Sequence, residues 1–226
     1  VFTLTLNPAT GAWTYNQVGA LDHPDTSNPN DIISVGFMVR ITDYDGDSID
    51  TPIVVRVADD GPSLDGSASA SLDESDGMGS VAGTLPFAFG HDGAGQVRLA
   101  DGPSGLTSHG QPITVVISAD GTRATGTLPD GALAFEVTLD KATGAYTFTQ
   151  FAPLDHPIAG NPDDVLSLGF GFTVTDGDGD STRGALTITV RDDGPTAGTA
   201  TLDVADLGVT VTGTLPHDYG ADGAGS

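Results

Sequence analysis

Two acidic, glycine-rich loops hold the residues of this sequence whose types and spacing could do chemistry. Each loop carries three aspartates at alternating positions: Asp43, Asp45 and Asp47 in the first, and Asp176, Asp178 and Asp180 in the second. Three carboxylates this close repel one another unless a cation lies between them, and the glycines among them allow the sharp turn that aims them at one point. The pattern therefore predicts a Ca²⁺ site in each loop, against the simpler interpretation of a solvated Asp/Gly turn.

The loops do not follow the pattern of an EF-hand. Ser181 stands where the glycine of that motif belongs, and Thr187 stands where its bidentate glutamate should be. Because three side chains do not supply the about 6–8 oxygens that Ca²⁺ binds, backbone carbonyls, water or another loop must contribute.

The composition narrows the classes of function. The 226 residues carry a net charge of -24, which argues against nucleic acid and anionic membranes as partners. Glu74 and Glu136 are the only glutamates among 31 acidic residues, and this bias towards aspartate favours loop chemistry, with a salt-adapted acidic surface as the alternative. There is no cysteine, so bound metal could take the place of disulfides. The sequence contains no run of about 20 apolar residues and therefore predicts no membrane-spanning helix.

An internal repeat organises the whole chain. Residues 1–62 align without a gap on residues 134–195, and 30 of the 62 pairs are identical. The Asp-Asp-Gly-Pro sequence at residues 59–62 returns at residues 192–195 and marks the end of each copy. We therefore expect the back half of one repeat at 1–62, a complete repeat at 63–195 and the front part of a third repeat at 196–226.

Alternating apolar residues predict strands and no long helix. The clearest cases are residues 33–41, 53–57, 113–117, 135–139, 146–148, 166–174 and 186–190, and Val209 and Val211 suggest one more. Gly144 fits the turn of a hairpin between two of these strands. The predicted fold is all-β, with tandem Ig-like β-sandwich repeats of about 133 residues joined end to end.

The order of strands predicts which loops meet at a junction between repeats. The hairpin loop that precedes the last strand should lie at the pole facing the preceding linker, so Asp176, Asp178 and Asp180 are expected to approach Asp59 and Asp60. By the same reasoning, Asp43, Asp45 and Asp47 are expected to approach the linker of an upstream repeat. Asp192 and Asp193 are expected to approach the loop of a downstream repeat.

Several other residues have two interpretations. Asp92 and Asp222 are expected in plain Asp/Gly turns, although a second metal site could form there. His23 and His156 favour packing or capping over Zn²⁺ binding. The carboxylates of Asp31, Asp163 and Asp164 could cap or ligate. The aromatic pairs Trp13/Tyr15 and Tyr146/Phe148 could stack on a glycan but are more typical of core or cross-strand contacts.

These motifs together resemble the long tandem repeats of giant RTX adhesins, which Gram-negative bacteria export by type I secretion. The resemblance rests on the Ala-Thr-Gly hairpin, the Leu-Asp-His-Pro turn, the Asp-Gly-Asp-Gly-Asp-Ser loop and the closing Asp-Asp-Gly-Pro. It implies extracellular, Ca²⁺-rigidified extender modules that hold a ligand-binding domain away from the cell surface in adhesion and biofilm formation. The Gly-Gly-x-Gly-x-Asp nonapeptides of the RTX region itself are absent, so the resemblance points to the repeat shaft.

We expect no catalysis, since no nucleophile-elbow, phosphate-loop or zincin motif is present. The expected partners are neighbouring repeats of the same polypeptide. Strands missing from the half-repeat 1–62 could come from upstream chain, a neighbouring molecule or the 196–226 segment of another copy, which would allow self-association. A glycan- or protein-binding β-sandwich and a filament subunit assembled by strand exchange are the alternatives.

Overall fold

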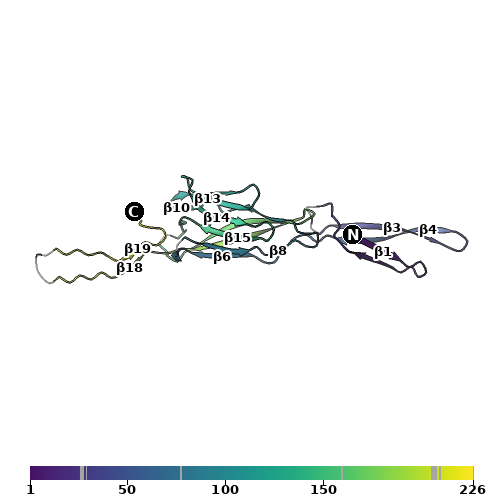
Figure 1. The fold of residues 1–226 in the computed structure, drawn as a ribbon, viewed down its shortest axis with the longest axis horizontal. Helices are drawn as coiled ribbons and strands as arrows, with labels where there is room; N and C mark the ends of the chain where they lie inside the picture. Colours follow the sequence, from purple (N-terminus) through teal and green to yellow (C-terminus); the bar gives the residue numbers. More distant parts are fainter. Residues whose placement is uncertain are drawn as a thin grey trace. The chain divides into compact units, whose positions relative to one another are not determined.

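The computed structural model describes residues 1–25, 28, 30–76, 78–158, 160–204, 208 and 210–225 (Figure 1). Strands make up almost all of its regular structure, and the one helix among these residues is the short 3-10 helix η1 (Glu74–Asp76). The all-β prediction is confirmed. The chain forms two compact units: residues 1–65, 86–97 and 173–184 make the first, and residues 66–85, 98–172 and 185–226 make the second.

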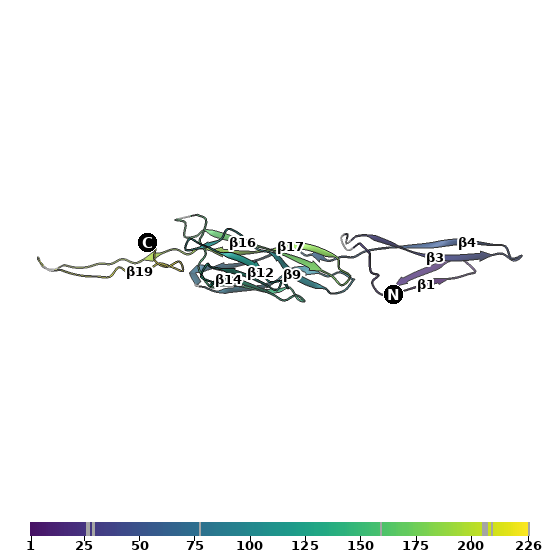
Figure 2. The same cartoon turned by 90° about the horizontal axis from the view of Figure 1, so that it is seen from above.

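An Ig-like β-sandwich makes up most of the second unit. One sheet has the order β12-β13-β14-β15-β7, formed by β12 (Thr114–Ile117), β13 (Arg123–Thr127), β14 (Leu133–Leu139), β15 (Ala145–Gln150) and β7 (Ser80–Thr84). The other has the order β6-β17-β16-β9, formed by β6 (Ala68–Asp73), β17 (Ser181–Arg191), β16 (Val165–Thr175) and β9 (Gln96–Asp101). Within the first sheet every pairing is antiparallel, whereas β6 pairs with β17 in parallel. The two long strands β16 and β17 lie side by side in the second sheet (Figure 2). Strands β9, β16 and β17 each include residues assigned to the first unit.

Aromatic side chains from both sheets meet in the core. Phe135 stacks on Phe148 within one sheet, and its edge meets the ring of Phe170 from the other at a centroid distance of 6.1 Å. All three rings are fully buried, together with Leu168 and Leu186. Burial of each such side chain contributes about 1.5–3 kcal/mol, so these contacts hold the two sheets together.

The strand pattern explains this core. In β16, buried and more exposed positions alternate from Leu168 to Val174, as the parity of the sequence predicts. The hairpin between β14 and β15 closes on Gly144, which has a φ of 71° that glycine adopts without strain.

The first unit contains two β-hairpins, β1 (Phe2–Leu6) with β2 (Trp13–Gln17) and β3 (Ile32–Thr42) with β4 (Ser48–Ala58). It also contains a short antiparallel pair of β5 (Ser63–Leu64) with β8 (Phe87–Ala88), which are distant in the chain. The ring of Phe2 stacks on Tyr15 and meets the edge of Phe37. Trp13 is 49% exposed, whereas its repeat counterpart Tyr146 is buried in the complete sandwich. The apolar face of the first half-repeat therefore stays open among the described residues.

The remaining elements are short. They are β10 (Thr107–Ser108) paired with β11 (Gln111–Pro112), and β18 (Thr196–Ala197) paired with β19 (His217–Asp218). The prediction of a strand at Val209 and Val211 was wrong for Val211, which is in no strand. Val209 lies outside the described residues. An apolar pair is too little to form a strand without a partner to pair with.

Gly126 of β13 is predicted to be irreplaceable because a Cβ there would lie 2.4 Å from the ring of the buried Phe135. Gly126→Ala should lower the free energy of unfolding by about 1–3 kcal/mol, measured by urea denaturation. Gly169→Ala on β16 is the matched control, since a Cβ there meets nothing within 4 Å. Equal stability of the two variants would contradict this close packing of Gly126 against Phe135.

Candidate metal centre

The loop between β16 and β17 and the loop between β3 and β4 share one backbone geometry. In each, the first aspartate caps the turn: Gly179 N–H donates to Asp176 Oδ1 and Gly46 N–H donates to Asp43 Oδ1, both at 3.1 Å. Gly179 and Gly46 have φ values of 111° and 101°, which L-residues with a side chain rarely adopt. The alternating spacing of the sequence thus places the three carboxylates of each loop within reach of one another.

Carboxylates from three separate segments meet around the second loop. Asp176, Asp178 and Asp180 can offer oxygens that lie within 4.8 Å of one another, and so can Asp178, Asp59 and Asp92. All five residues belong to the first compact unit. The structure therefore brings Asp59 of the linker to the loop as the strand order predicts, and it adds Asp92, for which the sequence favoured a plain turn.

Glycines allow these segments to approach so closely. A Cβ on Gly95 would lie 2.0 Å from the carbonyl oxygen of Thr175, and one on Gly177 would lie 2.4 Å from that of Asp92. Gly177 N–H also donates to the carbonyl of Gly93 at 3.1 Å, which fixes the two loops against each other. The Asp-Gly-Ala-Gly sequence at residues 92–95 is thus a packing motif as well as a turn, and this repeated motif is the sequence signal that could have located Asp92.

Most carboxylate oxygens in this cluster lack hydrogen-bond partners. Asp176 and Asp180 are only 4% and 1% exposed, yet one oxygen of Asp176 and both oxygens of Asp180 receive no hydrogen bond. Both oxygens of Asp178 and one each of Asp59 and Asp92 are likewise buried without a partner. Buried charges left in this way are costly unless a cation compensates them, and oxygen atoms alone are the ligand set of Ca²⁺. The residues therefore fit a calcium ion.

Burial and mutual repulsion also raise the pKa values of some of these carboxylates. Burial and the neighbouring carboxylates of Asp59 and Asp178 raise the pKa of Asp180 to about 7. Burial and the carboxylate of Asp178 raise the pKa of Asp176 to about 6. Burial together with Asp178 also raises the pKa of Asp92. Without a cation, protons partly take its place.

The second aspartate of each Asp-Asp-Gly-Pro sequence has a different environment. Asp60 Oδ2 accepts the backbone N–H of His91 at 3.0 Å and also contacts its imidazole, and Asp193 accepts the N–H of Ala221 at 2.9 Å. A Cβ on Gly220 would lie 2.3 Å from Asp193 Oδ2. The structure thus places Asp60 and Asp193 as anchors of the following Gly/Asp turn, and their part in metal binding stays a prediction.

The other predicted carboxylates lie in two further groups. Asp43, Asp45 and Asp47 form an exposed cluster of their own, with oxygens within 4.8 Å of one another. Asp192 lies with His156 and Glu74, and no local pattern in the sequence indicates that Glu74 belongs to this group. Asp164 caps a turn by accepting the N–H groups of Ile158 and Val165 at 2.7 Å, whereas Asp163 is exposed.

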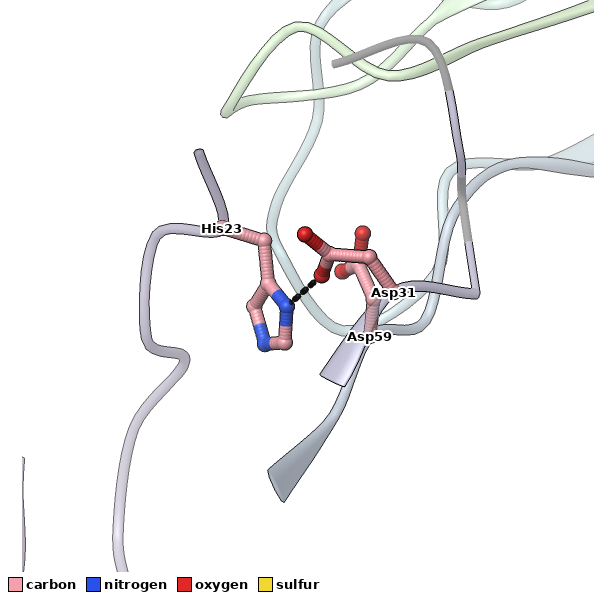
Figure 3. A group of neighbouring side chains, drawn as sticks. All are labelled: His23, Asp31 and Asp59. Atoms are coloured by element: carbon pink, nitrogen blue, oxygen red, sulfur yellow. Dashed lines mark hydrogen bonds and ion pairs between the residues drawn. The ribbon is translucent and has the colours of Figure 1, made fainter. Parts of the chain in front are cut away.

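His23 lies beside the linker carboxylate. Its Nδ1 contacts Asp31, and Asp59 completes the group (Figure 3). Burial opposes protonation of this imidazole, but the bond to Asp31 and the charge of Asp59 raise its pKa. Asp31, for which the sequence left capping or ligation open, therefore orients His23.

The aromatic residues considered for glycan stacking differ in their exposure to solvent. Tyr146 and Phe148 are buried and cannot stack on a ligand. Trp13 lines a cavity of about 420 Å³ together with Leu6, Val39 and Ile53, which is the open face of the first half-repeat.

The chain belongs to the protein family described as "Domain of unknown function (DUF5801)", whose model matches residues 1–54 and 64–189. No curated protein matches the sequence. Among solved structures, domains EC1-3 of protocadherin gamma C5 match with 14% identity and a TM-score of 0.28, too low to support an argument. That match covers 96% of this chain, which spans 65% of the protocadherin chain. None of the helices among the described residues meets the length and hydropathy needed to cross a membrane.

The raised pKa of Asp180 predicts an unusual pH dependence in the presence of a chelator. A folded-state pKa of about 7 exceeds the value of about 4 in the unfolded chain, so the folded protein binds more protons between these pH values. The free energy of unfolding should therefore fall as the pH rises from about 4 to about 7.

Asp180→Asn removes this titration, so the free energy of unfolding of the variant should fall less as the pH rises. Above pH 7 the variant should be more stable than the metal-free wild type. Urea denaturation in chelator at a series of pH values measures the difference. Parallel pH profiles for the two proteins would show that Asp180 does not titrate in this way.

Proposed function

We propose that the chain is a non-catalytic structural repeat of a secreted bacterial surface adhesin, in which bound Ca²⁺ stiffens a shaft that holds a distal binding domain away from the cell. The observation that carries the proposal is the convergence of Asp59, Asp92 and the loop 176–180, with buried carboxylate oxygens that have no hydrogen-bond partner. The RTX adhesin class, type I secretion and the role in adhesion and biofilm formation rest on the sequence motifs.

The chemistry of this cluster favours Ca²⁺ over other common cations. All the candidate ligands are oxygens, and five carboxylates with backbone carbonyls or water can reach the about 6–8 ligands of Ca²⁺. Mg²⁺ demands a stricter octahedron and keeps several waters, which suits a crowded carboxylate cluster poorly. The exposed cluster of Asp43, Asp45 and Asp47 is proposed as a second Ca²⁺ loop of the same kind.

Binding at this cluster would couple metal to the stiffness of the chain. Asp59 belongs to the linker of one repeat, whereas Asp92 and Asp178 belong to loops of the next. Without the ion their charges repel and the linker is free to move. With the ion they are held by one centre, and the binding free energy adds to the stability of the folded state. Extracellular modules of low affinity would be empty in the cytosol and filled after export.

The proposed partners are neighbouring repeats of the same polypeptide, without nucleic acid or membrane insertion. A glycan- or protein-binding module is the second candidate, and the cavity beside Trp13 is the observation in its favour. However, the counterpart of Trp13 in the complete repeat is the buried Tyr146, so the same face is core once a repeat is complete. Self-association or filament assembly by strand exchange would also cover this face.

Calcium should raise the melting temperature of the chain above its value in chelator, measured by differential scanning calorimetry. The double variant Asp178→Asn/Asp180→Asn removes two of the buried charges and should abolish most of this increase, because amides cannot neutralise the ion. Asp65→Asn, on an exposed aspartate of the same unit, should leave the increase unchanged.

Small-angle X-ray scattering of the same samples tests the stiffening. Calcium should narrow the distribution of interatomic distances in the wild type and in Asp65→Asn but not in the double variant. A calcium response of the double variant as large as that of the wild type would refute the assignment of these carboxylates.

A further inference from the structure

A buried histidine outside the calcium cluster has no hydrogen-bond partner on either ring nitrogen. The side chain of His156 is 4% exposed, and neither Nδ1 nor Nε2 receives or donates a hydrogen bond. Its Nε2 points to Glu74 Oε2 at 3.4 Å, too long for a normal hydrogen bond. A buried imidazole is rarely left in this state, because its polar atoms have lost water without replacement.

The carboxylate of Glu74 is held so that one oxygen faces His156. Its other oxygen, Oε1, accepts the backbone N–H of Leu154 at 3.2 Å and the side-chain amide of Gln150. The residue is 1% exposed, and Oε2 has no hydrogen-bond partner. Two donors thus fix the orientation of Glu74 and leave one oxygen free, as the outer-shell partners of a metal ligand do.

Asp192 completes the group and connects it to solvent. One ligand atom each from Glu74, His156 and Asp192 lies within 4.8 Å of the others, and Asp192 Oδ1 is buried without a partner. A cavity of about 380 Å³, lined in part by His156, Asp192 and Asp222, gives access to the group. All of these residues belong to the second compact unit.

From this arrangement we infer that Glu74, His156 and Asp192 form a site for a first-row transition-metal ion such as Zn²⁺. One imidazole nitrogen and two carboxylate oxygens are three ligands of the kind that Zn²⁺ takes, and water from the cavity supplies the fourth position of a tetrahedral site. Ca²⁺ is a poor occupant, since it selects oxygen ligands in larger number. The site therefore differs in chemistry from the calcium cluster and does not depend on it.

The corresponding histidine of the first repeat supports the distinction. His23 Nδ1 is already paired with Asp31, whereas the equivalent aspartate, Asp164, accepts two backbone N–H groups and leaves His156 unpaired. The free ring nitrogens of His156 are thus a property of this site.

Isothermal titration calorimetry with Zn²⁺, in the presence of saturating Ca²⁺, tests the inference. The 226-residue chain should bind Zn²⁺. His156→Gln and Glu74→Gln should each weaken zinc binding by at least ~10–100-fold, because the loss of an outer-shell partner alone has an effect of that size. His217→Gln, on an exposed histidine, is the control and should bind as the wild type does. Zinc affinity that is unchanged in His156→Gln, or that is absent from the wild type, overturns the inference.

X-ray absorption spectroscopy of the wild type with zinc guards against a variant that fails to fold. The inference requires one imidazole nitrogen at about 2.0–2.1 Å in the first shell, and a shell of oxygen alone would overturn it. Because calcium saturates its own sites throughout, failure here leaves the calcium proposal standing, and failure of the calcium proposal would appear in the melting experiment instead.

Discussion

The mutual repulsion of buried aspartates is the constraint on which the structure around residues 176–180 depends. Asp176 and Asp180 are almost completely shielded from water, with Asp59, Asp92 and Asp178 beside them. Such a group of like charges can persist only if protons or a cation offset it, and the raised pKa values show how strongly the bare cluster draws protons. A divalent ion would remove this conflict without protonation and would connect the three segments that carry the carboxylates.

The surrounding backbone is built to bring these charges together. Glycines at residues 95 and 177 remove the side chains that would hold the loops apart, and Asp60 fixes the turn that presents Asp92 by accepting the N–H of His91. The same anchor recurs between Asp193 and Ala221. Each repeat therefore devotes one aspartate of its Asp-Asp-Gly-Pro sequence to loop geometry, while the other lies among groups that could hold a metal.

The sequence predicts the fold class and the long strands because alternating apolar residues mark one buried face directly, as in β3 and β16. It also predicts that Asp59 meets the loop 176–180, since hairpin order determines which pole a loop occupies. Asp92 and Glu74 were not expected in their groups, because their neighbours in space are distant in the chain and no local pattern identifies them. The orphaned nitrogens of His156 could not be anticipated either, as a sequence does not indicate which buried groups lack partners. The strand expected at Val211 failed because two apolar residues do not specify pairing.

Crystallography with calcium tests the central claim most directly. Crystals grown with Ca²⁺ and measured at long wavelength should show an anomalous peak among Asp59, Asp92 and Asp178, with carboxylate oxygens at about 2.3–2.6 Å from the ion. A well-ordered map in which these carboxylates turn into solvent, with no ion among them, would contradict the account.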